Sequence, residues 1–98
     1  MPRLRTSPKF DRLYKKKATK NPRIKEAVDD ALKKFTQDPI PNSLDLKPMK
    51  SQKGSDMWGI DMPKMGGWRI MLYRKQDEEG VYYEAFLFGN HNETKDLF

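Results

Sequence analysis

The chain has 98 residues, no cysteine, one histidine and a formal net charge of +6. This composition excludes disulfides and thiolate chemistry, and it argues against a structural zinc site while leaving a carboxylate-bound magnesium ion open. No apolar run approaches the roughly 20 residues that span a bilayer, and no apolar signal-peptide core follows the first residues. We expect a single domain over residues 1–98, soluble, cytoplasmic and without a cofactor.

Positive charge is concentrated in the N-terminal quarter of the chain. Residues 1–25 contain ten Lys or Arg against one acid, Asp11, which gives +9, so the remaining residues carry −3 (9 − 3 = 6). A basic segment of this kind attracts polyanions, either nucleic acid or an acidic protein segment, through electrostatic steering and counterion release. The alternative is a solvated helix face that only keeps the protein soluble.

The basic segment is predicted to form a short edge strand followed by a helix. Residues Arg3–Thr6 are suited to the strand. Ser7 is suited to cap a helix that begins at Pro8, because the first helical position needs no N–H partner. Apolar residues then recur with the helical period as one stripe: Phe10, Leu13, Tyr14 and Ala18. We therefore predict an amphipathic, basic helix.

A second helix is predicted from Asn21-Pro22, and its apolar period continues until Asp38-Pro39 ends the run. Two helices joined so tightly should form an antiparallel hairpin that covers one face of a sheet. The prolines that follow predict a loop, with at most a brief extended piece at Leu44–Leu46.

Three strands are predicted in the C-terminal half of the chain. The first is Trp58–Met62, and turn glycines lead into the second, which begins at Trp68. The third, Val81–Phe88, follows the turn Asp77–Gly80 and is rich in aromatic residues. Because these strands form an antiparallel meander, the predicted fold class is α+β, with an N-terminal helical hairpin packed on one face of a small antiparallel β-sheet.

The second strand carries the first candidate functional residue, Arg69. With a period of two, Trp68, Ile70 and Leu72 point to one face of the strand, while Arg69, Met71 and Tyr73 point to the other. A guanidinium displayed in this way could bind phosphate, because it contacts two phosphate oxygens and stays charged at any working pH. Cations nearby in the sequence could assist: Lys47, Lys50, Lys64 and Arg74. The alternative is a surface arginine paired with Glu84 across the hairpin.

The second candidate is His91, which follows the third strand. It is the only side chain here whose unperturbed pKa lies close to neutrality, so it is the natural proton carrier, although a lone histidine is more often incidental. Asp61 could act as a base or could be an ordinary solvent-facing residue. Aromatic side chains could stack on bases or pack within the fold: Trp68, Tyr73, Tyr82, Phe86 and Phe88.

The order of these features resembles the RelE/ParE superfamily of bacterial toxins from type II toxin–antitoxin systems. The resemblance covers almost the whole chain and is carried by Ser7–Phe10, Gln37–Pro39, Leu46–Lys50, Trp58–Ile60, Trp68–Tyr73 and Phe88–His91. Each motif is weak alone, but their order and spacing together are fairly specific. The resemblance implies a compact domain in which two helices pack on an antiparallel sheet.

In the RelE-like branch, the resemblance implies a ribosome-dependent endoribonuclease that cuts mRNA and inhibits translation. Arg69 matches the arginine that contacts the scissile phosphate, and His91 lies where related toxins have a catalytic arginine or histidine. Substrate binding would involve Lys50, Lys64 and Arg74, and the terminal Phe98 matches an aromatic residue that helps to hold substrate in the YafQ-like branch.

The resemblance also implies an acidic cognate antitoxin that wraps the basic helices and shields the Arg69 face, with DNA contacted only through a toxin–antitoxin complex and no membrane contact. RelE has lysines on the strand where this chain has Gly59 and Asp61. ParE-like members share the fold and inhibit DNA gyrase without nuclease residues. Gyrase inhibition is therefore one alternative, and a non-catalytic module that binds only antitoxin or RNA is another.

Overall fold

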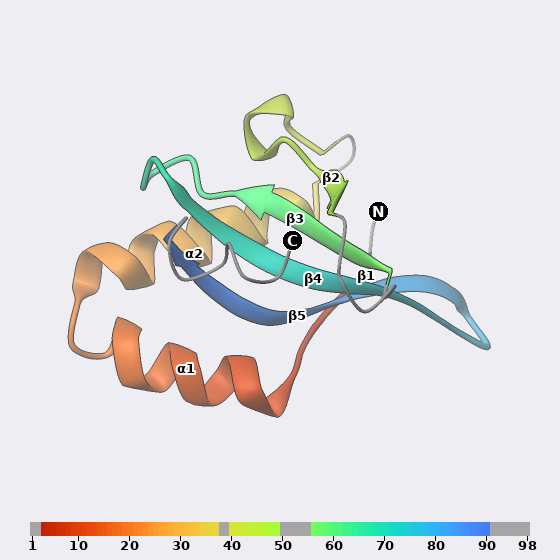
Figure 1. Ribbon diagram of the computed structural model, residues 1–98, viewed down its shortest axis with the longest axis horizontal. Helices are drawn as coiled ribbons and strands as arrows, with labels where there is room; N and C mark the ends of the chain where they lie inside the picture. Colours follow the sequence, from red (N-terminus) through yellow and green to blue (C-terminus); the bar gives the residue numbers. More distant parts are fainter. Residues whose placement is uncertain (1–2, 38–39, 50–55, 91–98) are drawn as a thin grey trace.

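The computed structural model describes residues 3–37, 40–49 and 56–90, which form two α-helices and a five-stranded sheet (Figure 1). The elements in chain order are β1 (Arg3–Thr6), α1 (Pro8–Ala18), α2 (Pro22–Phe35), the 3-10 helix η1 (Asn42–Leu44), β2 (Lys47–Met49), β3 (Met57–Asp61), β4 (Trp68–Asp77) and β5 (Gly80–Asn90). Both α-helices pack on the same face of the sheet. The predicted α+β class is therefore confirmed.

Both helices begin at the predicted caps. The Ser7 hydroxyl accepts a hydrogen bond from the Phe10 N–H at 3.1 Å, and the Asn21 side chain accepts one from the Arg23 N–H at 3.1 Å. These contacts satisfy N–H groups that the first helical turn leaves without a partner. No helix of the described residues is long and apolar enough to cross a membrane.

The helices run antiparallel, as expected, and are tied together by a side-chain contact (Figure 1). The Tyr14 hydroxyl of α1 donates a hydrogen bond to Asp29 of α2 at 2.7 Å. Helix α2 ends at Phe35, the last residue of its apolar period, and Thr36 caps it by donating to carbonyl groups of the last turn. The predicted stop signal, Asp38-Pro39, lies outside the described residues.

The strand order is β1-β5-β4-β3-β2. Strands β2 to β5 pair antiparallel, so the predicted meander of the last three strands is confirmed. Strand β1, however, pairs with β5 in parallel, which makes the sheet mixed and the prediction of an antiparallel sheet wrong at this edge. A tight turn forces antiparallel pairing, whereas the long chain between β1 and β5 leaves the direction of β1 unconstrained.

The main hydrophobic core lies between the helices and the sheet. Its fully buried side chains include Phe10, Val28 and Phe35 from the helices and Ile60, Ile70, Leu72 and Phe88 from the strands. The rings of Phe10 and Phe88 meet edge to face, with their centroids 5.3 Å apart. The predicted partition of β4 is confirmed, because Ile70 and Leu72 join this core while Met71 does not.

A β-bulge in β5 reorganises the aromatic strand. Met71 pairs with Leu87 and Leu72 pairs with Ala85, so Phe86 is an extra residue in the ladder. Ala85 then faces the main core, whereas Phe86 and Leu87 both pack near Met71 on the other side of the sheet. A bulge places two residues opposite one and shifts the facing of the residues that follow.

The segment before β2 departs from the prediction of an extended piece at Leu44–Leu46. Instead, η1 turns Leu44 into the main core, where it is fully buried. Asp45 follows with a φ of 48°, a left-handed conformation that aspartate tolerates because its short side chain bonds locally. The strand then begins at Lys47 and pairs with β3.

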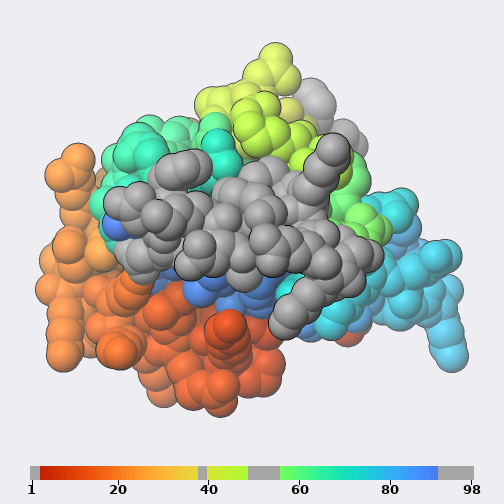
Figure 2. All heavy atoms as spheres, in the orientation of Figure 1, coloured from red at the N-terminus to blue at the C-terminus, as the bar shows by residue number. Residues whose placement is uncertain are grey.

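The β4–β5 hairpin closes through the predicted turn and is held by β1. Gly80 has a φ of 116°, which a side chain would oppose. Arg3 donates to both carboxylate oxygens of Asp77, at 2.7 and 3.1 Å, and to the Gly80 carbonyl at 2.7 Å. These hydrogen bonds from Arg3 are the main reason that the pKa of Asp77 falls to about 2. The hairpin projects at the end of the molecule opposite the turn between α1 and α2 (Figures 1 and 2).

Candidate functional site

The side of the sheet opposite α1 and α2 is called the second face. The strand register orients five side chains toward it: Lys47, Asp61, Arg69, Met71 and Tyr73. Arg69 lies on β4, with β3 on one side and β5 on the other. It is directly opposite Asp61 on β3 and Gly89 on β5. The predicted display of Arg69 away from the helical core therefore agrees with the register of β4.

Arg69 forms an ion pair with Asp61. The guanidinium Nε lies 3.3 Å from Asp61 Oδ1, and the two side chains are 26% and 41% exposed. The partner is not Glu84, the alternative that the sequence suggested, because the hairpin register places Glu84 opposite Tyr73. Glu84 instead accepts a hydrogen bond from Lys75 at 3.0 Å.

An incoming phosphate would compete with the Asp61 carboxylate for Arg69. A surface ion pair of this exposure contributes about 0–1 kcal/mol. A charge-assisted hydrogen bond to a phosphate contributes about 1.5–3 kcal/mol, and a guanidinium can form two of them. The balance therefore allows phosphate to bind at Arg69, although Asp61 weakens that binding.

Lys64 is close to Arg69 in the sequence, but its ammonium is directed to the helical layer. It lies in the turn between β3 and β4 and donates a hydrogen bond to Glu26 of α2 at 2.9 Å. That contact raises the pKa of Lys64 above its ordinary value. The structure therefore places Lys64 near the same end of the sheet as Arg69 without bringing the two charged groups together.

Arg74 is on the other side of the sheet from Arg69. They are five positions apart along β4, so they face opposite ways and lie roughly 16 Å apart along the strand. Arg74 pairs with Asp56, with Nη1 and Oδ2 at 3.5 Å, and its backbone N–H donates to the Asp56 carbonyl. The structure does not bring Arg74 to the candidate site.

The remaining predicted site residues, His91, Lys50 and Phe98, lie outside the described residues. The described end of β5 nevertheless defines where the strand finishes. Asn90 pairs with Trp68, the residue before Arg69 on β4. Strand β5 therefore ends beside Arg69, at the same end of the sheet.

A small apolar cluster occupies the middle of the second face. Met57, Met71 and Phe86 are buried in it, and Tyr73 and Leu87 pack against it. The rings of Tyr73 and Phe86 stack nearly parallel, with centroids 4.1 Å apart and an angle of 14°. The sequence did not predict this cluster, because Leu87 joins Phe86 on this side of the sheet only through the β-bulge.

The other aromatic residues that could have bound bases are engaged elsewhere. Phe88 is buried in the main core, and the Trp68 ring packs against that core with the Lys17 ammonium 5.8 Å from its centroid. The Tyr82 ring lies under the Arg5 guanidinium at 4.5 Å. Among the described aromatic residues, Tyr73 and Tyr82 are partly exposed on the second face, and Tyr73 is on the same strand as Arg69.

The residues around Arg69 thus provide a partly exposed guanidinium, a competing carboxylate and an adjoining stacked pair of rings. This arrangement can bind a phosphate group, and it places the end of β5 beside that group. No protein-family model, curated protein sequence or solved structure matches the chain.

Proposed function

We propose that this protein is the toxin of a type II toxin–antitoxin system and acts in the cytoplasm as a ribosome-dependent endoribonuclease that cuts mRNA. The observation that carries the proposal is the placement of Arg69, which projects from β4 on the face opposite the helices and beside the end of β5. The resemblance to RelE-like toxins gives the reaction, and the arrangement around Arg69 supports a phosphate-binding role.

The proposed reaction is a transesterification within the RNA. The ribose 2′-oxygen attacks the adjacent phosphorus while the bond from phosphorus to the 5′-oxygen breaks, which leaves a 2′,3′-cyclic phosphate and a free 5′-hydroxyl. A base removes the 2′-proton, and an acid protonates the departing 5′-oxygen. Cations stabilise the charge that develops on the phosphoryl oxygens.

Arg69 is assigned to charge stabilisation, because its guanidinium is a partly exposed cation at this end of the second face. His91 is assigned to proton transfer, since an imidazole titrates close to neutral pH. Lys50 and Lys64 would add positive charge, and Phe98 would position a base. For Lys64 this role requires the ammonium to leave Glu26, a weak contact on the surface.

The ribosome is the expected source of substrate orientation. A site with a partly neutralised arginine has little intrinsic rate, and holding the substrate in a reactive geometry can supply several kcal/mol of the barrier. An acidic antitoxin that covers Arg69 would control the toxin.

The Arg69–Asp61 ion pair favours a second candidate function, the inhibition of DNA gyrase by a ParE-like toxin. A carboxylate beside the only arginine on this part of the described second face opposes phosphate chemistry, and Gly59 and Asp61 stand where RelE has lysines. In this function the second face would be a protein-binding surface and His91 would have no chemical role.

The test is primer extension on an mRNA that is translated in a purified system. We expect wild-type protein to produce cuts only when ribosomes are present, with 5′-hydroxyl ends, and His91→Ala to abolish them while keeping its circular dichroism spectrum. Intact mRNA together with inhibition of gyrase supercoiling by the same preparation would reject the nuclease and support the second candidate.

A further inference from the structure

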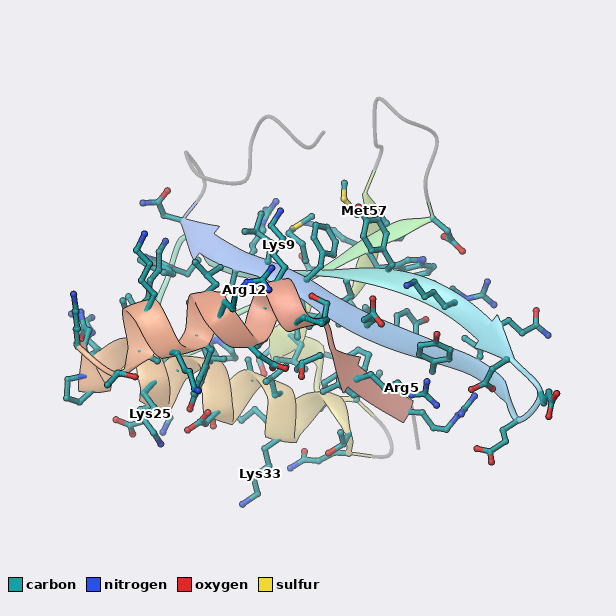
Figure 3. The ribbon with its side chains drawn as sticks, turned by 90° about the horizontal axis from the view of Figure 1, so that it is seen from below. Arg5, Lys9, Arg12, Lys25, Lys33 and Met57 are labelled. Carbon is teal, nitrogen blue, oxygen red and sulfur yellow. The ribbon has the colours of Figure 1, made fainter. Side chains whose placement is uncertain are left out.

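Helix α1 presents a stripe of cations away from the core. Lys9, Arg12 and Lys16 recur at i, i+3 and i+7, so they share one side of the helix over about 10 Å, and all three are exposed. Figure 3 shows Lys9 and Arg12 together on one side of α1, whereas Lys25 and Lys33 project from α2 in a different direction. In Figure 2 the α1 side chains, red to orange, form a continuous region along the lower edge.

The cations of this region are not neutralised by the acids of the described residues. None of the described carboxylates lies within ion-pair distance of Lys9, Arg12, Lys15, Lys16, Lys20 or Arg23. The single acid of α1 is Asp11. The positive charge of Lys9, Arg12 and Lys16 is therefore available to an external anion.

Helix α2 belongs to the same layer as α1, but most of its charged side chains differ from those of α1 in being paired. Lys25 pairs with Asp29 at 3.0 Å and Lys34 pairs with Asp30 at 3.2 Å, both at the i, i+4 spacing. Glu26 of α2 accepts from Lys64. The surface of α2 thus carries both signs of charge, whereas the exposed side of α1 offers an extended region of one sign.

The α1 region lacks the apolar groups that a protein partner or a single nucleic-acid strand would use. Among the described residues, Val81 is the only large hydrophobic side chain that is exposed, and it lies on β5 rather than on α1. Protein interfaces normally contain an apolar core, and single-strand binding normally uses stacking rings. A regular row of cations without either feature suits a phosphate backbone whose bases are already paired.

We infer that the exposed side of α1, defined by Lys9, Arg12 and Lys16, binds the phosphate backbone of double-helical RNA. The choice of RNA over DNA rests on the proposed function at the ribosome. This surface is separate from Arg69, because α1 packs on the face of the sheet opposite the one on which Arg69 is displayed. Binding there would hold the protein on structured RNA while the second face engages the mRNA.

The experiment measures fluorescence anisotropy of a labelled RNA hairpin with a fully paired stem, over a range of salt concentrations. Lys9→Ala/Arg12→Ala is compared with Lys25→Ala/Lys33→Ala, which removes the same charge from α2. Alanine favours the helix at all four exposed positions, so both variants should fold. We expect the α1 variant to bind at least about tenfold more weakly, with a salt slope reduced by about 2, and the α2 variant to change by less than about twofold.

Equal losses in the two variants would overturn the inference, because binding would then follow net charge alone. Tighter binding to a DNA duplex of the same sequence would overturn the assignment to RNA, and displacement of the hairpin by polyglutamate at equal charge concentration would assign the surface to an acidic protein. Hairpin binding that survives in Arg69→Ala supports a separate surface. A protein that binds the hairpin through α1 but cuts no mRNA would reject only the proposed function.

Discussion

The two faces of the sheet differ in what their side chains do. The helix-covered face is apolar along β3, β4 and β5, and its residues interlock with the stripes of α1 and α2 in one core. The second face holds a smaller apolar cluster and, toward one end, the Arg69–Asp61 pair. Most of the buried apolar side chains, and with them most of the hydrophobic stabilisation, belong to the helix-covered face. The second face is therefore able to carry polar groups that a core could not accommodate.

A large side chain on the second face should contribute less to stability than one in the main core. Phe88→Ala removes a fully buried ring that packs against Phe10, and it should lower the free energy of unfolding by about 3–5 kcal/mol. Tyr73→Ala removes a half-buried ring stacked on Phe86, and we expect about 1–2 kcal/mol. Urea unfolding measures both, and equal losses would contradict the division between the faces.

The contact between β1 and the β4–β5 hairpin should make the stability of the fold depend on pH. Because Arg3 lowers the pKa of Asp77 from 3.8 to about 2, the carboxylate form of Asp77 is favoured in the folded state. Its contribution to stability is fully present above the unfolded value of 3.8 and is lost as the pH falls through about 2. Asp77→Asn should therefore be less stable than wild type near neutral pH, and the difference should vanish toward pH 2. A difference that persists unchanged in acid would contradict the role of Arg3.

Asp61→Asn tests the electrostatics of the second face, and we expect it to have the smallest effect of these substitutions. Removing the carboxylate frees Arg69 from a surface ion pair of about 0–1 kcal/mol, which corresponds to at most about a fivefold gain in phosphate affinity. The mRNA cleavage rate at subsaturating ribosome concentration should rise by a similar factor. A loss of cleavage instead would show that Asp61 positions Arg69 or takes part in proton transfer.

Local patterns in the sequence predicted the elements that local contacts determine. The caps at Ser7 and Asn21 begin the helices, Gly80 closes the hairpin, and the period of two assigns Arg69 to the side opposite the core. Each of these features depends on residues within a few positions of one another. The same period also places Arg74 on the other side of the sheet from Arg69, although the two residues are close in the sequence.

Long-range contacts account for what the sequence did not predict. The parallel pairing of β1 with β5 joins residues about 80 positions apart, and no local signal fixes its direction. The β-bulge at Phe86 leaves no distinctive residue in the sequence. The turn between β3 and β4 sets the register of the two strands and thereby places Asp61 opposite Arg69. Counting residues outward from that turn could have predicted this ion pair from the sequence.

The most direct test of the second face as the functional face compares Arg69→Ala with Arg74→Ala. The two substitutions remove the same side chain from the same strand, on opposite sides of the sheet, and each should change stability by less than about 1 kcal/mol. In the ribosome-dependent primer-extension assay, we predict that Arg69→Ala lowers the cleavage rate by about 10²-fold or more and that Arg74→Ala stays within about threefold of wild type. Equal losses, or full activity in Arg69→Ala, would contradict the account.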